Sequence, residues 1–304
     1  MGKRTIVFGF VILLVFSPLH AQGNHGTRSD QRGAPFTFAF MTDVHMNTRD
    51  MEMSSKGLRR ALEHAKSEGV DFVIFGGDLV DIDRLQPEDS LQADRLFTAF
   101  KSIVEEAGIK AYFTIGNHDR YYTFNNQPDA PGFNLFQKHL GETYYSFDHK
   151  GVHFVVLNSV QVNDSTKKYM IGPEQLEWLK TDLARLPDQT PLVVSTHVPF
   201  QSLYYPAVEG VVKDVDMVSN FKEVWDILLN HDLKVILQGH QHLHEELLVN
   251  KTNFVTGGAI CAAWWQGPLL DTEEGYLLIR VDDNNNFSWK YMDYGWDPDE
   301  HAID

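Results

Sequence analysis

Apolar and polar positions along the chain predict strands and helices in alternation. Short and almost wholly apolar runs at 36–41, 72–75 and 110–114 are typical of strands that are covered on both faces. Between these runs, apolar side chains recur every three to four residues over 54–66 and 90–107, which predicts two helices. The order strand, helix, strand, helix, strand predicts a parallel sheet with right-handed crossovers.

The rest of the chain continues this pattern after a long aromatic loop at 121–132, and the segment from 244 to 292 predicts antiparallel strands. The expected elements are a hairpin of 143–148 and 152–158, a helix from Pro173, a strand at 192–196, a helix at 221–229, a strand at 235–237, and strands near 244–249, 253–256, 275–281 and 287–292. We therefore expect one folded domain at 35–294, between a flexible lead-in at 22–34 and a loose acidic tail at 295–304.

The first 21 residues predict a secretory signal peptide. Lys3 and Arg4 form a basic start, residues 6–16 are apolar, and residues 19–21 resemble a cleavage site. Because the apolar run is too short to span a bilayer, an uncleaved anchor is the weaker alternative. We expect an exported protein, periplasmic or secreted, without a stable membrane anchor.

Charge and cysteine content restrict the partners. The formal net charge of the chain is -16, and it becomes -18 without residues 1–21, which hold two basic and no acidic side chains. Such a chain should not present a nucleic-acid-binding surface, and an anionic substrate would need local positive charge, for which bound cations are the obvious source. Cys261 is the only cysteine, so an internal disulfide is excluded and we expect a small buried hydrophobic residue there.

Five predicted strand ends carry side chains of the types that bind metal ions. Singly each is weak evidence, but the carboxyl ends of parallel strands meet in one crevice. Imidazole, carboxylate and amide ligands without thiolate favour Mn, Fe or Zn and disfavour a closed structural zinc site. Seven ligands are too many for one ion and suit two divalent transition-metal ions, with Asp78 on the middle strand as the bridging carboxylate. The seven are Asp43, His45, Asp78, Asn117, His197, His240 and His242.

The motifs that contain these residues resemble the signature of the calcineurin-like metallophosphoesterases. They read Asp-x-His at 43–45, Gly-Asp at 77–78, Gly-Asn-His-Asp at 116–119, a single His197 after a strand, and Gly-His-x-His at 239–242. The resemblance implies an α/β fold, a four-layer α/β/β/α sandwich of two mixed sheets flanked by helices.

The same resemblance implies a role for each residue. Asp43, His45, Asp78 and His242 would hold one metal ion. Asp78 would also hold the other ion, together with Asn117, His197 and His240. His118 would face the substrate without binding metal, and Asp81 would hold the ring of His118.

Two positions depart from better-known branches of that family. Purple acid phosphatases have a tyrosine where this chain has Asp81, which argues against an iron-tyrosinate centre. Protein Ser/Thr phosphatases follow the matching aspartate with a phosphate-binding arginine, whereas this chain has Ile82. The signal peptide and the compact catalytic unit look more like a bacterial exported phosphoesterase.

The expected function is hydrolysis of a phosphomonoester or phosphodiester in a small phosphorylated substrate, by in-line attack of a hydroxide that bridges two metal ions. A metal-loaded protein that binds a phosphorylated ligand without turnover is the alternative, and a structural zinc protein is a third. His118 and Asp81 favour hydrolysis, since a binding protein needs neither. The sequence predicts neither the substrate nor the oligomeric state.

Overall fold

A computed structural model of the chain describes residues 33–298. The predicted signal peptide, nearly all of the predicted lead-in and the last residues of the predicted acidic tail lie outside this range. No helix within it combines the length and the apolar character needed to cross a membrane.

Two mixed sheets lie at the centre of the fold. The first sheet has the order β15 (Phe287–Asp293), β14 (Gly275–Val281), β1 (Phe36–Met41), β2 (Phe72–Phe75), β3 (Lys110–Phe113). The second has the order β12 (Glu245–Val249), β13 (Thr252–Thr256), β11 (Asp232–Gln238), β10 (Pro191–Ser195), β7 (Val152–Val156), β6 (Tyr145–His149). Strands β1 to β3 pair in parallel, as do β7, β10, β11 and β13, whereas the other strands pair antiparallel with their neighbours.

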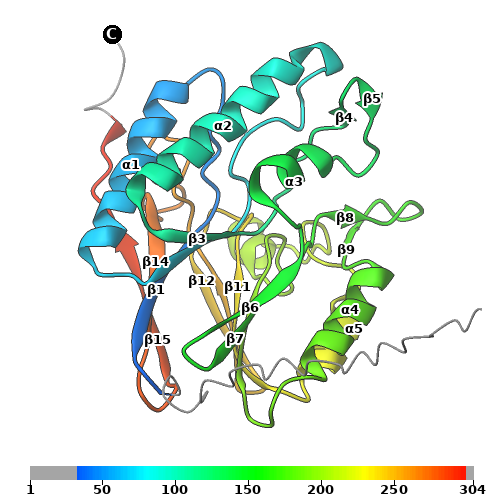
Figure 1. The fold of residues 1–304 in the computed structure, drawn as a ribbon, viewed down its shortest axis with the longest axis vertical. Coiled ribbons are helices and arrows are strands. Elements are labelled where there is room, and N and C mark those ends of the chain that lie inside the picture. Colours follow the sequence, from blue (N-terminus) through cyan, green and yellow to red (C-terminus); the bar gives the residue numbers. More distant parts are fainter. Residues whose placement is uncertain (1–32, 299–304) are drawn as a thin grey trace, which may run out of the picture. The chain divides into compact units, whose positions relative to one another are not determined.

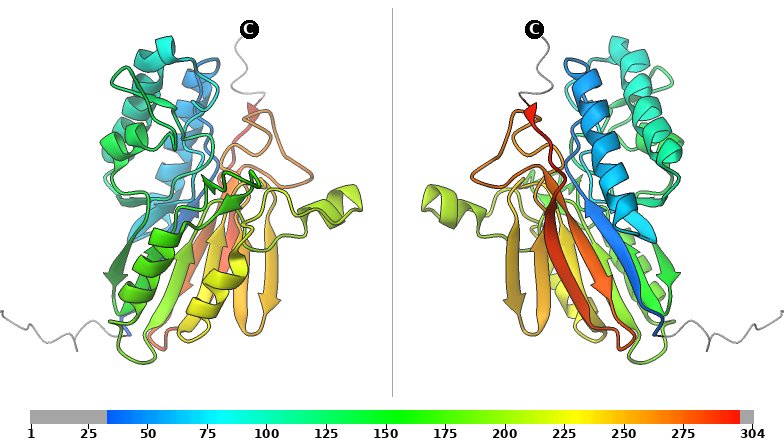
Figure 2. Two further views of the ribbon diagram at one scale, coloured as in Figure 1. Left: turned by 90° about the vertical axis from the view of Figure 1, so that its right-hand side faces the viewer. Right: turned by 90° about the vertical axis from the view of Figure 1, so that its left-hand side faces the viewer.

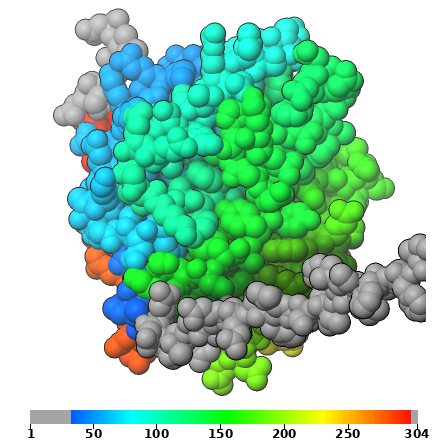
Figure 3. Space-filling view, in the orientation of Figure 1, coloured from blue at the N-terminus to red at the C-terminus, as the bar shows by residue number. Residues whose placement is uncertain are grey.

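Helices cover the outer faces of both sheets. They are α1 (Met51–Ser67), α2 (Ser90–Ala107), α3 (Asn134–Leu140), α4 (Pro173–Leu183) and α5 (Phe221–Leu228), with a short 3-10 turn η2 (Pro87–Asp89) before α2. Helices α1 and α2 lie on one side of the strands and α4 and α5 on the other (Figure 1). In the orientation of the space-filling view, side chains from the α2 and α3 part of the chain close much of the visible face (Figure 3). The predicted four-layer α/β/β/α sandwich is confirmed.

Alternation along β1 shows why its sequence is almost wholly apolar. Phe36, Phe38 and Phe40 point between the sheets, where the ring of Phe38 stacks on Phe72 at 5.0 Å. Ala39 and Met41 face the helix layer instead, so both faces of the strand are buried beyond Thr37. Burial of a phenylalanine side chain contributes about 1.5–3 kcal/mol, so this inter-sheet layer is a large part of what holds the two sheets together.

Most predicted elements are confirmed, and those at 36–41, 72–75 and 90–107 have the predicted bounds. The short helix α3, the two-residue strands β4 (Thr123–Phe124), β5 (Gln127–Pro128), β8 (Gln161–Val162) and β9 (Tyr169–Met170), and the π-helix η3 (Tyr205–Glu209) were not predicted, because elements of this length carry little periodicity. The segment around η3 projects outward from the domain (Figure 2).

The segment from 244 to 292 differs from the prediction in its pairing. Strands β12 and β13 do form an antiparallel hairpin, as do β14 and β15. The two hairpins join different sheets, however, and β13 also pairs in parallel with β11. Trp296, inside the predicted acidic tail, is buried, and its ring lies 5.5 Å from that of Trp265, so the folded domain extends at least this far.

Candidate metal centre

The predicted ligands all follow strands that run in parallel. Asp43 and His45 come directly after β1, Asp78 after β2, and Asn117 after β3 in the first sheet. His197 follows β10, and two further histidines, His240 and His242, follow β11 in the second sheet. The structure brings all seven side chains together at the carboxyl ends of these strands.

One cluster forms around His45. Its Nε2 atom lies 3.0 Å from Nε2 of His242, 3.8 Å from Oδ1 of Asp43 and 3.7 Å from Oδ2 of Asp78. Nε2 of His242 is in turn 3.4 Å from Oδ1 of Asp43. All four side chains are buried, so two carboxylates and two imidazoles meet in a space from which water is largely excluded.

A second cluster shares Asp78 with the first. Nε2 of His197 lies 3.1 Å from Oδ2 of Asp78 and 3.1 Å from the amide oxygen of Asn117. A ligand atom of His240 lies within 4.8 Å of both Asp78 and His197. The other carboxylate oxygen of Asp78, Oδ1, accepts a hydrogen bond of 2.8 Å from the backbone N–H of His118. Oδ2 of Asp78 is therefore placed between the two clusters, as a bridging ligand requires.

Hydrogen bonds on the far side of the imidazole rings determine which nitrogen faces the centre. Nδ1 of His197 donates to the carbonyl oxygen of Gly76 at 2.9 Å, and Nδ1 of His242 donates to that of Ala262 at 2.6 Å. A carbonyl oxygen can only accept a hydrogen bond, so both Nδ1 atoms carry the proton. In the neutral ring, Nε2 then has a free lone pair that faces the centre.

His45 follows the same rule, since its Nδ1 donates to the carboxylate of Asp81 at 2.6 Å. The neutral rings of His45 and His242 therefore direct lone pairs at one another across 3.0 Å. Two lone pairs at this separation repel unless a proton or a cation lies between them. With carboxylates beside them, this donor set fits divalent transition-metal ions, and His45, His197 and His242 are each held from behind as metal-binding histidines are.

The backbone at the ligand positions is strained. Asp43, His45, Asp78, His240 and His242 all have positive φ angles, between 49° and 76°. Residues with a Cβ rarely adopt this left-handed conformation, which costs of order 1–3 kcal/mol at each position. The loops therefore turn sharply at the strand ends and direct consecutive side chains into the centre.

Glycine permits the close contact between two of these loops. A Cβ atom on Gly116 would lie 2.0 Å from the backbone nitrogen of Asp78. The loops after β2 and β3 could not approach each other with any larger residue at this position.

Charge in the centre is balanced by close opposite partners. Burial alone would lower the pKa of His197, but the charge and hydrogen bond of Asp78 outweigh it and raise that pKa to about 9. Burial would raise the pKa of Asp78, yet the charge of His197 and neighbouring histidines lowers it. The carboxylate of Asp78 is thus ionised. In protein without metal its negative charge is balanced by protons on histidines, and divalent cations would displace these protons.

The predicted partner of His118 requires a correction. Nδ1 of His118 donates to Oδ1 of Asp83 at 2.8 Å, whereas Oδ1 of Asp81 is 3.7 Å away. Asp81 instead accepts from His45, as described above. The reason lies in the loop after β2, which turns so that its two carboxylates reach different rings. Asp83, which sequence reasoning did not select, therefore orients His118, and Asp81 orients a metal-ligand candidate.

Asp119, the last residue of the Gly-Asn-His-Asp motif, joins two of the ligand loops. It is fully buried, and its carboxylate accepts hydrogen bonds from the backbone N–H groups of Leu79, Val80 and Gly116. Burial, followed by the negative charge of Asp78, raises its pKa to about 7. Its position in the Gly-Asn-His-Asp motif was the sequence feature that could have pointed to it. Its carboxylate binds backbone N–H groups of the ligand loops and does not face the metal centre.

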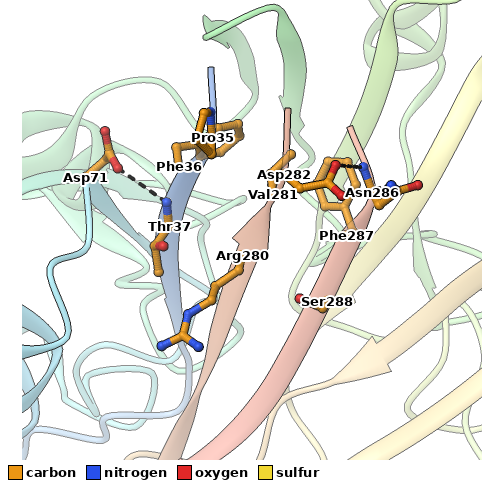
Figure 4. A pocket seen from close by; sticks show the side chains of 10 residues that line it. All are labelled: Pro35, Phe36, Thr37, Asp71, Arg280, Val281, Asp282, Asn286, Phe287 and Ser288. Carbon is orange, nitrogen blue, oxygen red and sulfur yellow. Dashed lines mark hydrogen bonds between the residues drawn. The ribbon is translucent and has the colours of Figure 1, made fainter. Parts of the chain in front are cut away.

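Cys261 is buried, as expected for a small hydrophobic residue, and burial raises the pKa of its thiol to about 12. A cavity of about 530 Å³ is found elsewhere, between the start of β1, Asp71 and the β14–β15 turn (Figure 4). None of its lining residues belongs to the two clusters, and it lies where β1 begins, at the opposite end of that strand from the candidate centre.

Comparison with known proteins agrees with this geometry. A family model described as calcineurin-like phosphoesterase matches residues 36–244. Purple acid phosphatase 22 of Arabidopsis thaliana is 27% identical over 198 residues, which cover 60% of this chain and 41% of that protein. The human serine/threonine-protein phosphatase CPPED1 is 26% identical over 196 residues, which cover 62% of this chain and 59% of that protein.

A dimetal phosphatase of Danio rerio has the same fold, with a TM-score of 0.57 at 15% identity over 81% of this chain and 95% of that chain. The two curated relatives are matched over less than two thirds of their own lengths.

Proposed function

Because this chain belongs to the calcineurin-like phosphoesterase family, we propose that it is a two-metal phosphohydrolase that acts on a small phosphorylated substrate. One observation carries the proposal most strongly. A single carboxylate oxygen, Oδ2 of Asp78, is shared by two clusters of buried histidine and aspartate side chains. A protein that only binds a phosphorylated ligand does not need this arrangement together with an oriented histidine beside it.

Each ligand set has a defined place in the proposal. Asp43, His45, Asp78 and His242 would hold one ion, and Asp78 with Asn117, His197 and His240 would hold the other. Two divalent ions, when bound, supply neutralisation of phosphate oxygens and a lowered pKa for a water molecule between them. This supply of positive charge matters because the chain as a whole is strongly acidic.

His118 is the proposed proton donor to the leaving oxygen. Its ring lies 4.9 Å from that of His45, so it stands at the border of the first cluster, and its side chain is 24% exposed to solvent. Burial lowers the pKa of His118, but its hydrogen bond to Asp83 and the charge of Asp78 outweigh burial and raise it. A raised pKa favours the protonated ring, which is the form that a general acid needs.

Hydrolysis of generic substrates tests the proposal directly. We expect protein reconstituted with Mn, Fe or Zn to hydrolyse p-nitrophenyl phosphate or bis(p-nitrophenyl) phosphate, to lose activity with a chelator and to regain it with metal. The relative rates on the two substrates decide between monoester and diester preference. Binding of phosphate esters without turnover under every metal condition would support the ligand-binding alternative and exclude hydrolysis.

We also propose that the protein is exported. The basic start, the apolar run at 6–16 and the small residue Ala21 support a cleaved secretory signal. The absence of nucleic-acid or membrane partners is proposed on the strongly negative charge of the chain.

A further inference from the structure

Trp264 stands beside the proposed centre with much of its surface free. It lies in the segment that follows β13, and 46% of its surface is exposed to solvent. Its ring lies 4.5 Å from that of His242, tilted by 31°, and 5.8 Å from that of His45. One side of the indole therefore covers two candidate ligands of the same metal ion, and the rest of it remains accessible.

The segment that carries Trp264 is held firmly in place. The neighbouring Trp265 is 1% exposed, and its indole N–H donates to the carbonyl oxygen of Val44 at 3.0 Å. A Cβ atom on Gly57 of α1 would lie 2.0 Å from the Trp265 ring, so the helix packs directly against it. Trp265 thus anchors the segment to the domain, and Trp264 is presented from a fixed base.

The backbone around Trp264 is also strained in the same sense as the ligand loops. Ala262, Trp264 and Trp265 have φ angles of 37°, 53° and 69°. Left-handed conformations at bulky residues cost of order 1–3 kcal/mol each and persist only where the surroundings impose them. This conformation has a visible result, since the carbonyl of Ala262 orients His242 while the next turn lays Trp264 over the same ring.

The rings of His118 and Trp264 are both close to the imidazole ring of His45. The centroid of His118 is 4.9 Å from it and that of Trp264 is 5.8 Å from it. The distance between the centroids of the proposed proton donor and the exposed indole can therefore be no larger than the sum of these two distances. The indole N–H forms no hydrogen bond to any other residue between 33 and 298, so it is free to meet a ligand.

We propose that Trp264 stacks against a flat aromatic group carried by the leaving group, which makes phosphoesters of nucleosides the preferred substrate class. This inference rests on the proposed phosphohydrolase function. The proton donor marks where the leaving oxygen must lie, and the indole lies within reach of a nucleoside attached to that oxygen, since both rings are close to His45. Every nucleobase has a π-face that can stack on such a ring, which selects a base-bearing substrate without selecting which base.

A matched pair of substrates isolates the stacking contribution. Adenosine 5′-monophosphate and ribose 5-phosphate have the same primary leaving oxygen and differ in the presence of the base. If the protein hydrolyses only diesters, the methyl phosphodiesters of the same two compounds form the pair, and release of the nucleoside or of ribose is measured. Stacking of one base contributes about 1–3 kcal/mol, so wild-type kcat/KM should be about 5- to 150-fold higher for the nucleotide.

Two variants separate stacking from simple coverage of His242. Trp264→Leu keeps apolar bulk over the histidine but has no aromatic face, and Trp264→Phe keeps such a face. We expect Trp264→Leu to remove most of the preference by lowering kcat/KM for the nucleotide, with less than about a threefold change for ribose 5-phosphate and unchanged metal content. Trp264→Phe should retain most of the preference. Nucleotide binding should also quench tryptophan fluorescence in the wild type and much less in Trp264→Leu.

Three results would overturn the inference while leaving the proposed function intact. They are hydrolysis of both substrates with equal kcat/KM by the wild type, an equal loss on both substrates in Trp264→Leu, and a loss of metal in that variant that accounts for its lower activity. If metal-reconstituted wild type hydrolyses neither this pair nor the nitrophenyl esters, the phosphohydrolase proposal itself fails, and the inference fails with it.

Discussion

Replacement of Asp83 by asparagine should affect the proton donor and leave the metal ligands unchanged. The carboxylate of Asp83 accepts from Nδ1 of His118 at 2.8 Å, and the two side chains are 23% and 24% exposed. A hydrogen bond to a charged group contributes about 1.5–3 kcal/mol, and partial exposure with a remaining amide acceptor reduces the loss to about 1–1.5 kcal/mol. We therefore expect kcat to fall about 5- to 10-fold for a substrate whose leaving group needs a proton.

The substrate and the pH provide the specific readout. An alkyl phosphate has a poor leaving group, whereas nitrophenolate leaves with little need of a proton, so Asp83→Asn should slow the alkyl ester more. Loss of the Asp83 charge also removes a contribution that raises the pKa of His118, so the basic limb of the kcat profile should move to lower pH. His118→Ala should show the same difference between substrates more strongly and should abolish this limb.

Asp81→Asn is the matched control, because Asp81 lies two positions away in the same loop but accepts from His45. Removal of a carboxylate behind a metal-binding histidine costs about 10- to 100-fold in metal affinity, so this variant should need more metal for half-maximal activity. At saturating metal it should show the wild-type ratio between the two substrates. If Asp81→Asn shifts the basic limb and Asp83→Asn only weakens metal binding, the assignment of the two carboxylates is wrong.

Three other consequences can be measured independently. Asp119→Asn should lower the free energy of unfolding by about 1–3 kcal/mol in urea denaturation, because an amide N–H₂ would face the N–H of Gly116, and an unchanged stability would contradict this role. In metal-stripped protein the pKa of His197, about 9, lies above its ordinary value of 6.5, so its contribution to stability is complete below pH 6.5 and is lost as pH rises through 9. The Tm of stripped protein should fall over this window more than that of metal-loaded protein, and equal profiles would show that His197 does not titrate there. Exported protein should begin at or near Gln22 by intact mass, and retention of residues 1–21 would refute cleavage of the signal peptide.

The sequence was sufficient to predict the layers and the ligand set because both depend on regular structure. Apolar runs of strand length alternate with helical periodicity, and parallel strands bring their carboxyl ends together whatever the exact loop geometry. Asp43, Asp78 and His197 could therefore be assigned to one crevice from their positions after strands. The order of strands in the second sheet was less accessible, since periodicity does not show which neighbour a strand such as β13 will choose.

Contacts that depend on irregular backbone could not be predicted from the sequence. Asp81 and Asp83 are two residues apart in a loop without regular structure, and the turn of that loop decides which carboxylate reaches His118. Trp264 follows the same principle, because its place over His242 depends on left-handed backbone angles that bulky residues rarely adopt. Only the structure therefore shows which ring Trp264 covers.

Metal content per chain tests the central claim of two ions bridged by Asp78 most directly. Elemental analysis of reconstituted and desalted protein should give close to two divalent transition-metal ions per chain in the wild type. Asp78→Asn should lose both ions together, since Oδ2 of Asp78 lies in both clusters, whereas Asp83→Asn should keep both. One ion per chain in the wild type, unchanged in Asp78→Asn, would contradict the two-metal centre.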